Sequence, residues 1–181
     1  MRALGLHPVT DTRRTFRALL TAMSRPGTIE SVPEPADRAV IATLVDHEVG
    51  LATDDDQLRE ALASQGRLST CPVEGADVVH AHDHTRLDVR ECDRGSLEEP
   101  ADGATVVYRV PAISQDPVGT TTLSLSGPGI DGTRRLSVGL PESELDALAA
   151  AQEPYPRGVD AVFASDERLA AVPRSTTVEV V

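Results

Sequence analysis

The sequence predicts an α/β protein, a mixed β-sheet flanked by helices, with residues 1–181 forming one domain. Helical patterns alternate with short β-branched segments in the first half of the chain, and β-branched segments cluster in the second half. The 181 residues are 40% hydrophobic and 25% charged, a balance typical of a globular domain with its own core. Interleaved helices and strands favour helices packed on the faces of a mixed sheet.

The first helix is predicted over residues 11–23. Four apolar side chains recur there at i, i+3, i+4 and i+7: Phe16, Leu19, Leu20 and Met23. This spacing predicts that they form one buried stripe on the helix. The SRPG tetrapeptide that follows ends the helix, because a residue before proline avoids the helical conformation and glycine gives the turn its freedom.

Three further helices are predicted over residues 37–45, from the aspartates at 54–56 to about 65, and over 141–152. The aspartates provide a cap and negative charge at the positive end of the third helix. Pro141 suits the first turn of the last helix, where its missing N–H costs nothing.

The strands are predicted from β-branched runs bounded by Gly, Pro or Asp. They cover residues 49–53, 67–71, 77–82, 105–110, 120–126, 134–138, 159–164, 168–172 and 176–180. The SGPG tetrapeptide at 126–129 predicts a tight turn between two of these strands. Residues 93–103 are expected to be a loop.

The chain contains no lysine, and its seventeen basic residues are all arginine. This excludes a Schiff base with pyridoxal phosphate, a phosphate-binding loop of the GxxxxGK[ST] type, and a lysine general base. We therefore expect no pyridoxal cofactor, and nothing in the sequence implies another one.

The charge balance is strongly acidic, with 29 Asp and Glu and a formal net charge of −12. The core must be built from small aliphatic residues, because the chain has two Phe, two Tyr and no Trp. Together with the missing lysine, these features predict a salt-adapted, halophilic protein. At 1 M salt the Debye length falls to roughly 3 Å, so the repulsion between surface carboxylates would be screened.

The same acidity predicts no binding to nucleic acid or to anionic membranes, since no basic stripe could displace counterions. No apolar run approaches the ~20 residues of a membrane span, and the N-terminus carries no signal-peptide pattern. We expect a cytoplasmic protein. Cys71 and Cys92 are too few for a disulfide framework, a thiolate zinc site or an iron–sulfur cluster.

Several segments are distinctive in combination. They are PVTD at 8–11, FRALLTAMSRPG at 16–27, LSLSGPGI at 123–130, PYPRGVD at 154–160 and AVPRSTTVEV at 171–180. Their order and spacing resemble the H subunit of the carbon–phosphorus lyase core complex, which extracts phosphate from phosphonates. The likeness runs from about residue 6 to the C-terminus and is weakest between about 30 and 100.

This resemblance implies a subunit of an assembly with the G, I and J subunits, and a homodimer when isolated. The assembly's first step displaces adenine from ATP with a phosphonate, giving a ribose 1-phosphonate 5-triphosphate. The resemblance also implies a fold similar to the pyridoxal-phosphate-dependent transferases without their cofactor site. It assigns no catalytic residue to this chain.

Four residues in the matching segments are candidates for anion binding. Arg157 and Arg174 lie beside Gly or Pro in predicted turns, and a guanidinium suits phosphate or phosphonate oxygens. The alternative for both is pairing with the abundant carboxylates. Gly127 and Gly129 could bring backbone N–H groups to an anion, but Pro128 between them has none, and a tight turn is the alternative role.

A histidine cluster, HAHDH at 80–84, gives a competing hypothesis from a different class. If residues 77–82 form a strand, His80 and His82 share one face of it. Asp83 and His84 could complete a mononuclear zinc or iron site of a metal-dependent hydrolase. The alternative is a set of polar residues at the end of a strand, facing solvent.

The leading functional hypothesis is an accessory or structural subunit of the phosphonate-processing complex, without turnover of its own. Sheet edges near the C-terminal tail and the exposed face of the first helix are the expected contact regions. A weaker third hypothesis, based only on the arginines in turns, is a nucleotide-binding module for the ATP of the complex.

Overall fold

The computed structural model describes residues 4–117, 121–153 and 155–181. The described residues contain α1 (Thr10–Ser24), α2 (Ala36–Leu44), α3 (Asp56–Ala63) and α4 (Glu142–Gln152). Each confirms one predicted helix to within about two residues. Short 3₁₀ turns η2 (Val73–Gly75), η3 (His84–Arg86), η4 (Val89–Glu91) and η5 (Pro100–Asp102) join several of the other elements.

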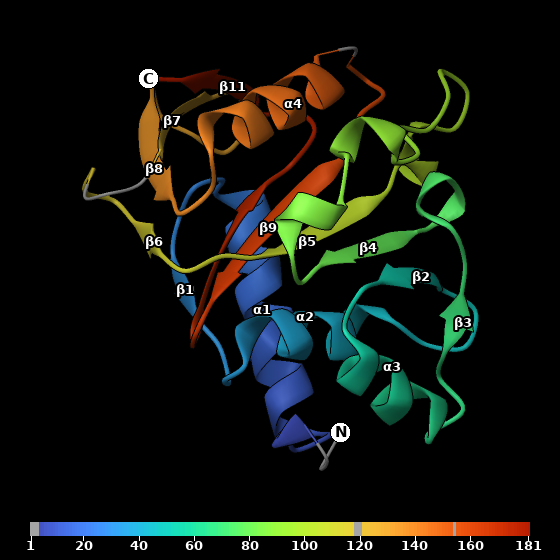
Figure 1. Cartoon of the computed structure of the whole chain (residues 1–181). Coiled ribbons are helices and arrows are strands. Elements are labelled where there is room, and N and C mark those ends of the chain that lie inside the picture. Colours follow the sequence, from blue (N-terminus) through green and yellow to red (C-terminus); the bar gives the residue numbers. More distant parts are fainter. Residues whose placement is uncertain (1–3, 118–120, 154) are drawn as a thin grey trace.

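Seven of the described strands form a large mixed sheet in the order β1-β10-β9-β5-β4-β2-β3 (Figure 1). They are β1 (Glu30–Ser31), β2 (Gly50–Thr53), β3 (Ser69–Thr70), β4 (Val78–Ala81), β5 (Thr105–Arg109), β9 (Asp160–Ser165) and β10 (Arg168–Val172). Strands β3, β2, β4, β5 and β9 run parallel, whereas β9, β10 and β1 pair antiparallel.

A second, antiparallel sheet has the order β11-β7-β8-β6. Its strands are β6 (Ile113–Ser114), β7 (Thr121–Ser126), β8 (Arg134–Val138) and β11 (Thr177–Val180). The predicted mixed α/β class and all nine predicted strands are confirmed, except that Thr120, at the start of one of them, lies outside the described residues. Strands β1 and β6 were not predicted, because two-residue strands carry no periodicity.

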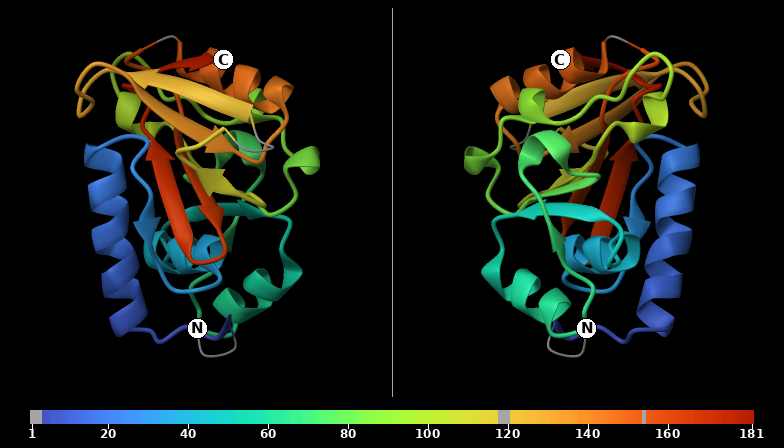
Figure 2. Two further views of the ribbon diagram at one scale, coloured as in Figure 1. Left: turned by 90° about the vertical axis from the view of Figure 1, so that its left-hand side faces the viewer. Right: turned by 90° about the vertical axis from the view of Figure 1, so that its right-hand side faces the viewer.

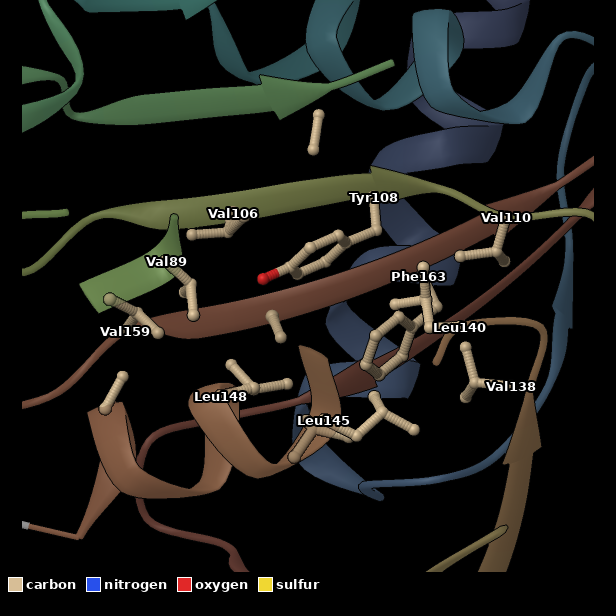
Figure 3. Packing of buried hydrophobic residues seen from close by; sticks show 14 of the residues in the cluster. Val89, Val106, Tyr108, Val110, Val138, Leu140, Leu145, Leu148, Val159 and Phe163 are labelled. Atoms are coloured by element: carbon tan, nitrogen blue, oxygen red, sulfur yellow. The ribbon is translucent and has the colours of Figure 1, made fainter. Parts of the chain in front are cut away.

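The large sheet lies between two apolar clusters because successive side chains of its strands point to opposite faces. On β5, Val107 faces the layer of α1, α2 and α3, whereas Val106 and Tyr108 face α4 and the small sheet. Figure 3 shows the second cluster, where the Tyr108 and Phe163 rings stack with centroids 5.6 Å apart.

The predicted buried stripe of α1 is wrong. Leu19 is buried, but Phe16 and Leu20 are 51% and 55% exposed, and Met23 is half-buried. The face that packs inward consists instead of Thr15, Ala18, Leu19 and Ala22. Small residues on this face let α1 approach α2 and the sheet closely, which leaves the larger side chains outside.

The SRPG segment ends α1 as predicted, and Gly27 adopts a left-handed φ of +75°. Residues 93–103 form a loop that includes η5. Among the helices of the described residues, none combines the length and apolar character that crossing a membrane requires.

Candidate functional site

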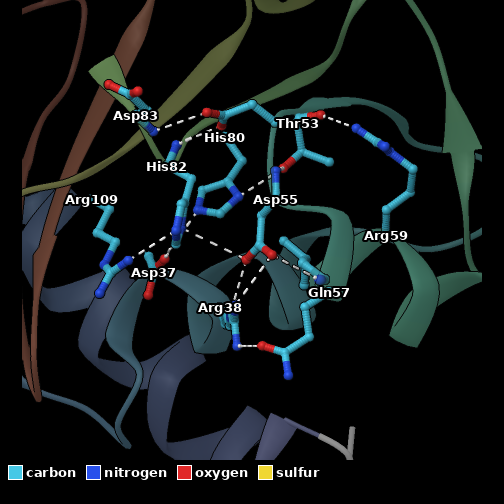
Figure 4. A network of polar contacts seen from close by, with 12 residues as sticks. Asp37, Arg38, Thr53, Asp55, Gln57, Arg59, His80, His82, Asp83 and Arg109 are labelled. Atoms are coloured by element: carbon cyan, nitrogen blue, oxygen red, sulfur yellow. Dashed lines mark hydrogen bonds and ion pairs between the residues drawn. The ribbon is translucent and has the colours of Figure 1, made fainter. Parts of the chain in front are cut away.

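Polar side chains gather where the parallel strands β2, β4 and β5 end, at one edge of the large sheet. Carboxyl ends of parallel strands meet at the same edge, and ligands of α/β proteins commonly bind there. Thr53 ends β2 and is the register partner of His80 on β4. His82 follows β4, and Arg109 ends β5. All four residues contribute to one network, drawn in Figure 4.

His80 is the buried centre of this network, with 2% of its surface exposed. Its Nδ1 lies 2.9 Å from Thr53 Oγ1, and its Nε2 lies 3.1 Å from Asp37 Oδ2 in the first turn of α2. The alternation along β4 explains the placement: Val79 and Ala81 point to the opposite cluster, so His80 must face α2.

His82 points to the same side as His80, as the predicted strand spacing requires. Its Nδ1 lies 3.5 Å from Asp37 Oδ2 and 3.7 Å from Asp55 Oδ2, and its Nε2 accepts a hydrogen bond of 2.9 Å from Arg109 Nη1. We call Asp37, Asp55, His80 and His82 the His–Asp cluster.

The two carboxylates of the His–Asp cluster are buried but ionised. Burial raises the pKa of Asp37, yet the hydrogen bond from His80, a backbone hydrogen bond from Arg38 and the nearby charge of Arg109 hold this pKa below its usual range. Burial likewise raises the pKa of Asp55, which the Arg38 guanidinium and a backbone N–H bring below its usual range. Arg38 Nε donates to Asp55 Oδ2 at 2.8 Å.

The chemistry of this group suits a metal ion: one ligand atom each from Asp37, His80 and His82 all lie within 4.8 Å of one another. The predicted set of His80, His82 and His84 is thus only partly brought together. His84 lies in η3, outside this group, and Asp83 caps that turn by accepting hydrogen bonds from Thr85.

The sequence missed both carboxylates of the cluster. Asp55 had a sequence signal, since the aspartates at 54–56 follow one predicted strand and His82 ends another, and the structure pairs these two strands in parallel as β2 and β4. Asp37 had no such local signal: it is 43 residues from His80 and reaches the site only through the packing of α2.

The predicted anion-binding glycines form the turn between β7 and β8. Gly127 and Gly129 have φ of +125° and +80°, values that favour glycine. A Cβ on Gly129 would lie 2.3 Å from the Ser24 carbonyl oxygen, and one on Gly127 would lie 3.1 Å from the Ser175 carbonyl oxygen. The turn is therefore pressed against the end of α1 and the 171–180 segment, a structural role.

Of the two predicted arginines, Arg174 is engaged inside the protein. Its Nη2 pairs with Asp160 Oδ2 at 2.6 Å, and the same guanidinium donates to the carbonyl oxygens of Pro100 and Gly103. This arrangement favours carboxylate pairing over anion binding. Arg157 is exposed in the turn after α4.

Arg174 also borders a groove of about 860 Å³ between the end of α4 and the residues leading into β11. Pro128, Tyr155 and Glu179 contribute to its walls. Among the described residues of these walls, Arg174 is the one arginine, and it already donates to Asp160, so the groove does not resemble an anion site.

Comparison with known proteins places these observations in a family. The sequence model of the family described as bacterial phosphonate metabolism protein (PhnH) matches residues 6–179. A protein of Stutzerimonas stutzeri, HtxG, whose name provisionally makes it a C-P lyase subunit, is 34% identical over 169 residues, covering 91% of this chain and 84% of its own.

A second relative is the alpha-D-ribose 1-methylphosphonate 5-triphosphate synthase subunit PhnH of Rhizobium meliloti (strain 1021). It is 29% identical over 192 residues, covering 95% of this chain and 92% of its own. The resemblance carried by the motifs is confirmed, and the chain belongs to the PhnH family of bacterial phosphonate metabolism proteins.

Proposed function

We propose that this chain is an accessory subunit of a carbon–phosphorus lyase complex that degrades phosphonates, acting in the step that forms a ribose 1-phosphonate 5-triphosphate from ATP. The observation that carries the proposal is the family match over residues 6–179, together with relatives named as subunits of this machinery. Its partners in the cytoplasm are the G, I and J subunits, and the isolated chain is a homodimer.

An accessory role agrees with how the family motifs are used in the fold. The turn around Gly129 packs against the end of α1, and Arg174 pairs with the carboxylate of Asp160. Gly27 N–H, for example, donates to the Ala171 carbonyl oxygen at 3.0 Å. These motifs hold the two sheets together, which supports a structural role for them.

The fold that we propose is that of the pyridoxal-phosphate-dependent transferases with the cofactor chemistry lost. A parallel sheet whose carboxyl ends carry polar groups supports this relation. The residues present do not fit pyridoxal phosphate, because no lysine exists to form its Schiff base.

The outer face of α1 is the surface that we assign to a partner subunit. Val9, Phe16 and Leu20 are 60%, 51% and 55% exposed, and their spacing of i, i+7 and i+11 places them on one face of the helix. Figure 2 shows α1 at the periphery of the molecule. An apolar stripe of this kind on a protein with a net charge of −12 is typical of a surface that another chain covers.

Co-expression with the G, I and J subunits of the same organism tests the proposal. With the tag on the I subunit, this chain should co-purify in stoichiometric amount, and the complex without it should no longer form the ribose phosphonate product. The isolated chain should convert neither ATP nor phosphonate. Turnover by the isolated chain, or a fully active complex that lacks it, would refute an accessory role.

A further inference from the structure

We propose that Asp37, His80 and His82 form a binding site for a divalent metal ion of the zinc class. This site goes beyond the accessory function, and its test uses the isolated chain. It differs from the set suggested by the HAHDH motif, since Asp37 of α2 replaces His84.

The spacing of the ligand atoms matches a tetrahedral site. Zinc binds imidazole nitrogen and carboxylate oxygen at about 2.0–2.1 Å, which places neighbouring ligands of a tetrahedron about 3.3 Å apart. Asp37 Oδ2 lies 3.1 Å from His80 Nε2 and 3.5 Å from His82 Nδ1. The three ligand atoms all lie within 4.8 Å of one another, so side-chain shifts of up to about 1.5 Å would bring them around one ion.

The groups behind the ligands are those that orient a metal-binding histidine. The second ring nitrogen of such a histidine usually contacts a polar group that fixes the ring. His80 Nδ1 has the Thr53 hydroxyl at 2.9 Å, which suits either tautomer because a hydroxyl both donates and accepts. His80 can thus move its proton to Nδ1 and offer Nε2 to the metal without losing this contact.

The Nδ1 atom of His82 is a buried polar atom that makes no hydrogen bond within the described part of the chain. It faces the carboxylates of Asp37 and Asp55 at 3.5 and 3.7 Å. A cation between these groups would satisfy this nitrogen and balance the carboxylate charge. Asp55, already held by Arg38, would lie beside the ion as a fourth ligand or as a partner of a bound water.

Arg109 opposes the metal, as does the positive charge of Arg38, which donates to both carboxylate oxygens of Asp55. Arg109 donates to His82 Nε2 at 2.9 Å, so the proton of a neutral His82 now resides on Nδ1. Metal binding at Nδ1 would move that proton to Nε2, where it would face the N–H of Arg109. Because Arg109 is exposed, it can turn into solvent, but its departure lowers the affinity.

The test uses the full chain purified without a histidine tag, loaded with Zn²⁺ or Co²⁺ and dialysed. We expect one metal per chain by elemental analysis, the visible absorption of tetrahedral Co²⁺, and a melting temperature that rises with Zn²⁺. His82→Ala changes a partly exposed side chain, so it should fold yet lose more than about 100-fold in affinity. Asp37→Asn keeps the size of the buried side chain and should lower the metal affinity by a similar factor.

Two further variants separate this site from chance binding. His84→Ala removes the third histidine of the HAHDH motif, which lies outside the site, and should leave the affinity unchanged, whereas Arg109→Gln should raise it. Absence of stoichiometric metal after loading would overturn the proposal. So would equal affinity in His82→Ala, Asp37→Asn and the unmodified chain. Because binding is measured on the isolated chain, its failure leaves the subunit function untouched, and failure of the complex to assemble leaves the metal site untouched.

Discussion

Replacement of Phe16 and Leu20 by serine tests the outer face of α1 as a subunit interface. Full burial of such side chains contributes about 1.5–3 kcal/mol each. Since each is about half exposed in the isolated chain, covering the exposed part contributes about 1 kcal/mol per residue. The double variant should therefore weaken assembly by about 2 kcal/mol, or about 30-fold in Kd.

The assay is calorimetric or surface-based titration of this chain against the assembled G, I and J subunits. Leu97→Ser provides the matched control, because Leu97 is 73% exposed in the loop between η4 and η5 and should leave Kd unchanged. The free energy of unfolding of the double variant should fall by no more than about 2 kcal/mol, because the buried half of each side chain contributes about 1 kcal/mol. That of Leu97→Ser should stay within about 0.5 kcal/mol of the parent.

Two results would refute the reasoning. An unchanged Kd in the Phe16→Ser, Leu20→Ser variant would show that another surface meets the partners. A large loss of stability in the isolated variant would show instead that these side chains belong to the core, as the helical periodicity had suggested.

Three further outcomes follow from charge and packing. The melting temperature should rise steeply between dilute buffer and molar KCl, because salt screens the −12 net charge; a flat profile contradicts salt adaptation. Gly129→Ala should lower the free energy of unfolding by more than about 2 kcal/mol, since a positive φ costs about 1–2 kcal/mol and the new Cβ would meet the Ser24 carbonyl oxygen at 2.3 Å. Gly132 has φ +70° and open space around it, so Gly132→Ala should lower the free energy of unfolding only by the cost of the positive φ. Urea unfolding measures both variants, and equal losses would exclude a contribution from the clash at Gly129. Asp55→Asn should destabilise the fold by about 3 kcal/mol at neutral pH by leaving Arg38 unpaired. Because the pKa of Asp55 is below its usual range in the folded state, its stabilisation is present above the unfolded pKa and is lost as the pH falls through the folded one. The difference between variant and parent should therefore shrink in urea unfolding from pH 5 downward, and a constant difference would contradict the pairing.

Local signals were sufficient for most of the secondary structure. Runs of β-branched residues located strands such as β5 and β9, and capping residues located helices such as α3, whose Asp55 accepts a hydrogen bond from Leu58 N–H. The very short β1 and β6 were missed because their pairing comes from neighbouring strands rather than from their own residues.

Helical periodicity failed to identify the buried face of α1. The i, i+3, i+4 and i+7 spacing of four apolar residues predicts one buried stripe that includes Phe16 and Leu20. The structure instead buries Ala18 and Ala22, because α2 and β10 approach this face closely. A single sequence does not distinguish a helix that packs on a core from one that keeps its apolar side chains for a partner.

For the candidate site as well, the local pattern predicted one part correctly and another part wrongly. The period of a strand placed His80 and His82 on one face correctly, since that alternation is a local property of the backbone. The motif wrongly suggested His84 as the third ligand, because the chain turns into η3 after β4 and places His84 outside the site.

The sequence by itself determined the α/β class, the absence of any lysine chemistry, the acidic character of the chain and, through its motifs, the family. Only the tertiary structure decided that Asp37 meets His80, that Arg174 is paired with Asp160, and that Phe16 faces outward. The physical reason is that composition and periodicity act over a few residues, whereas these contacts depend on how α1 and α2 pack on a sheet assembled from distant segments.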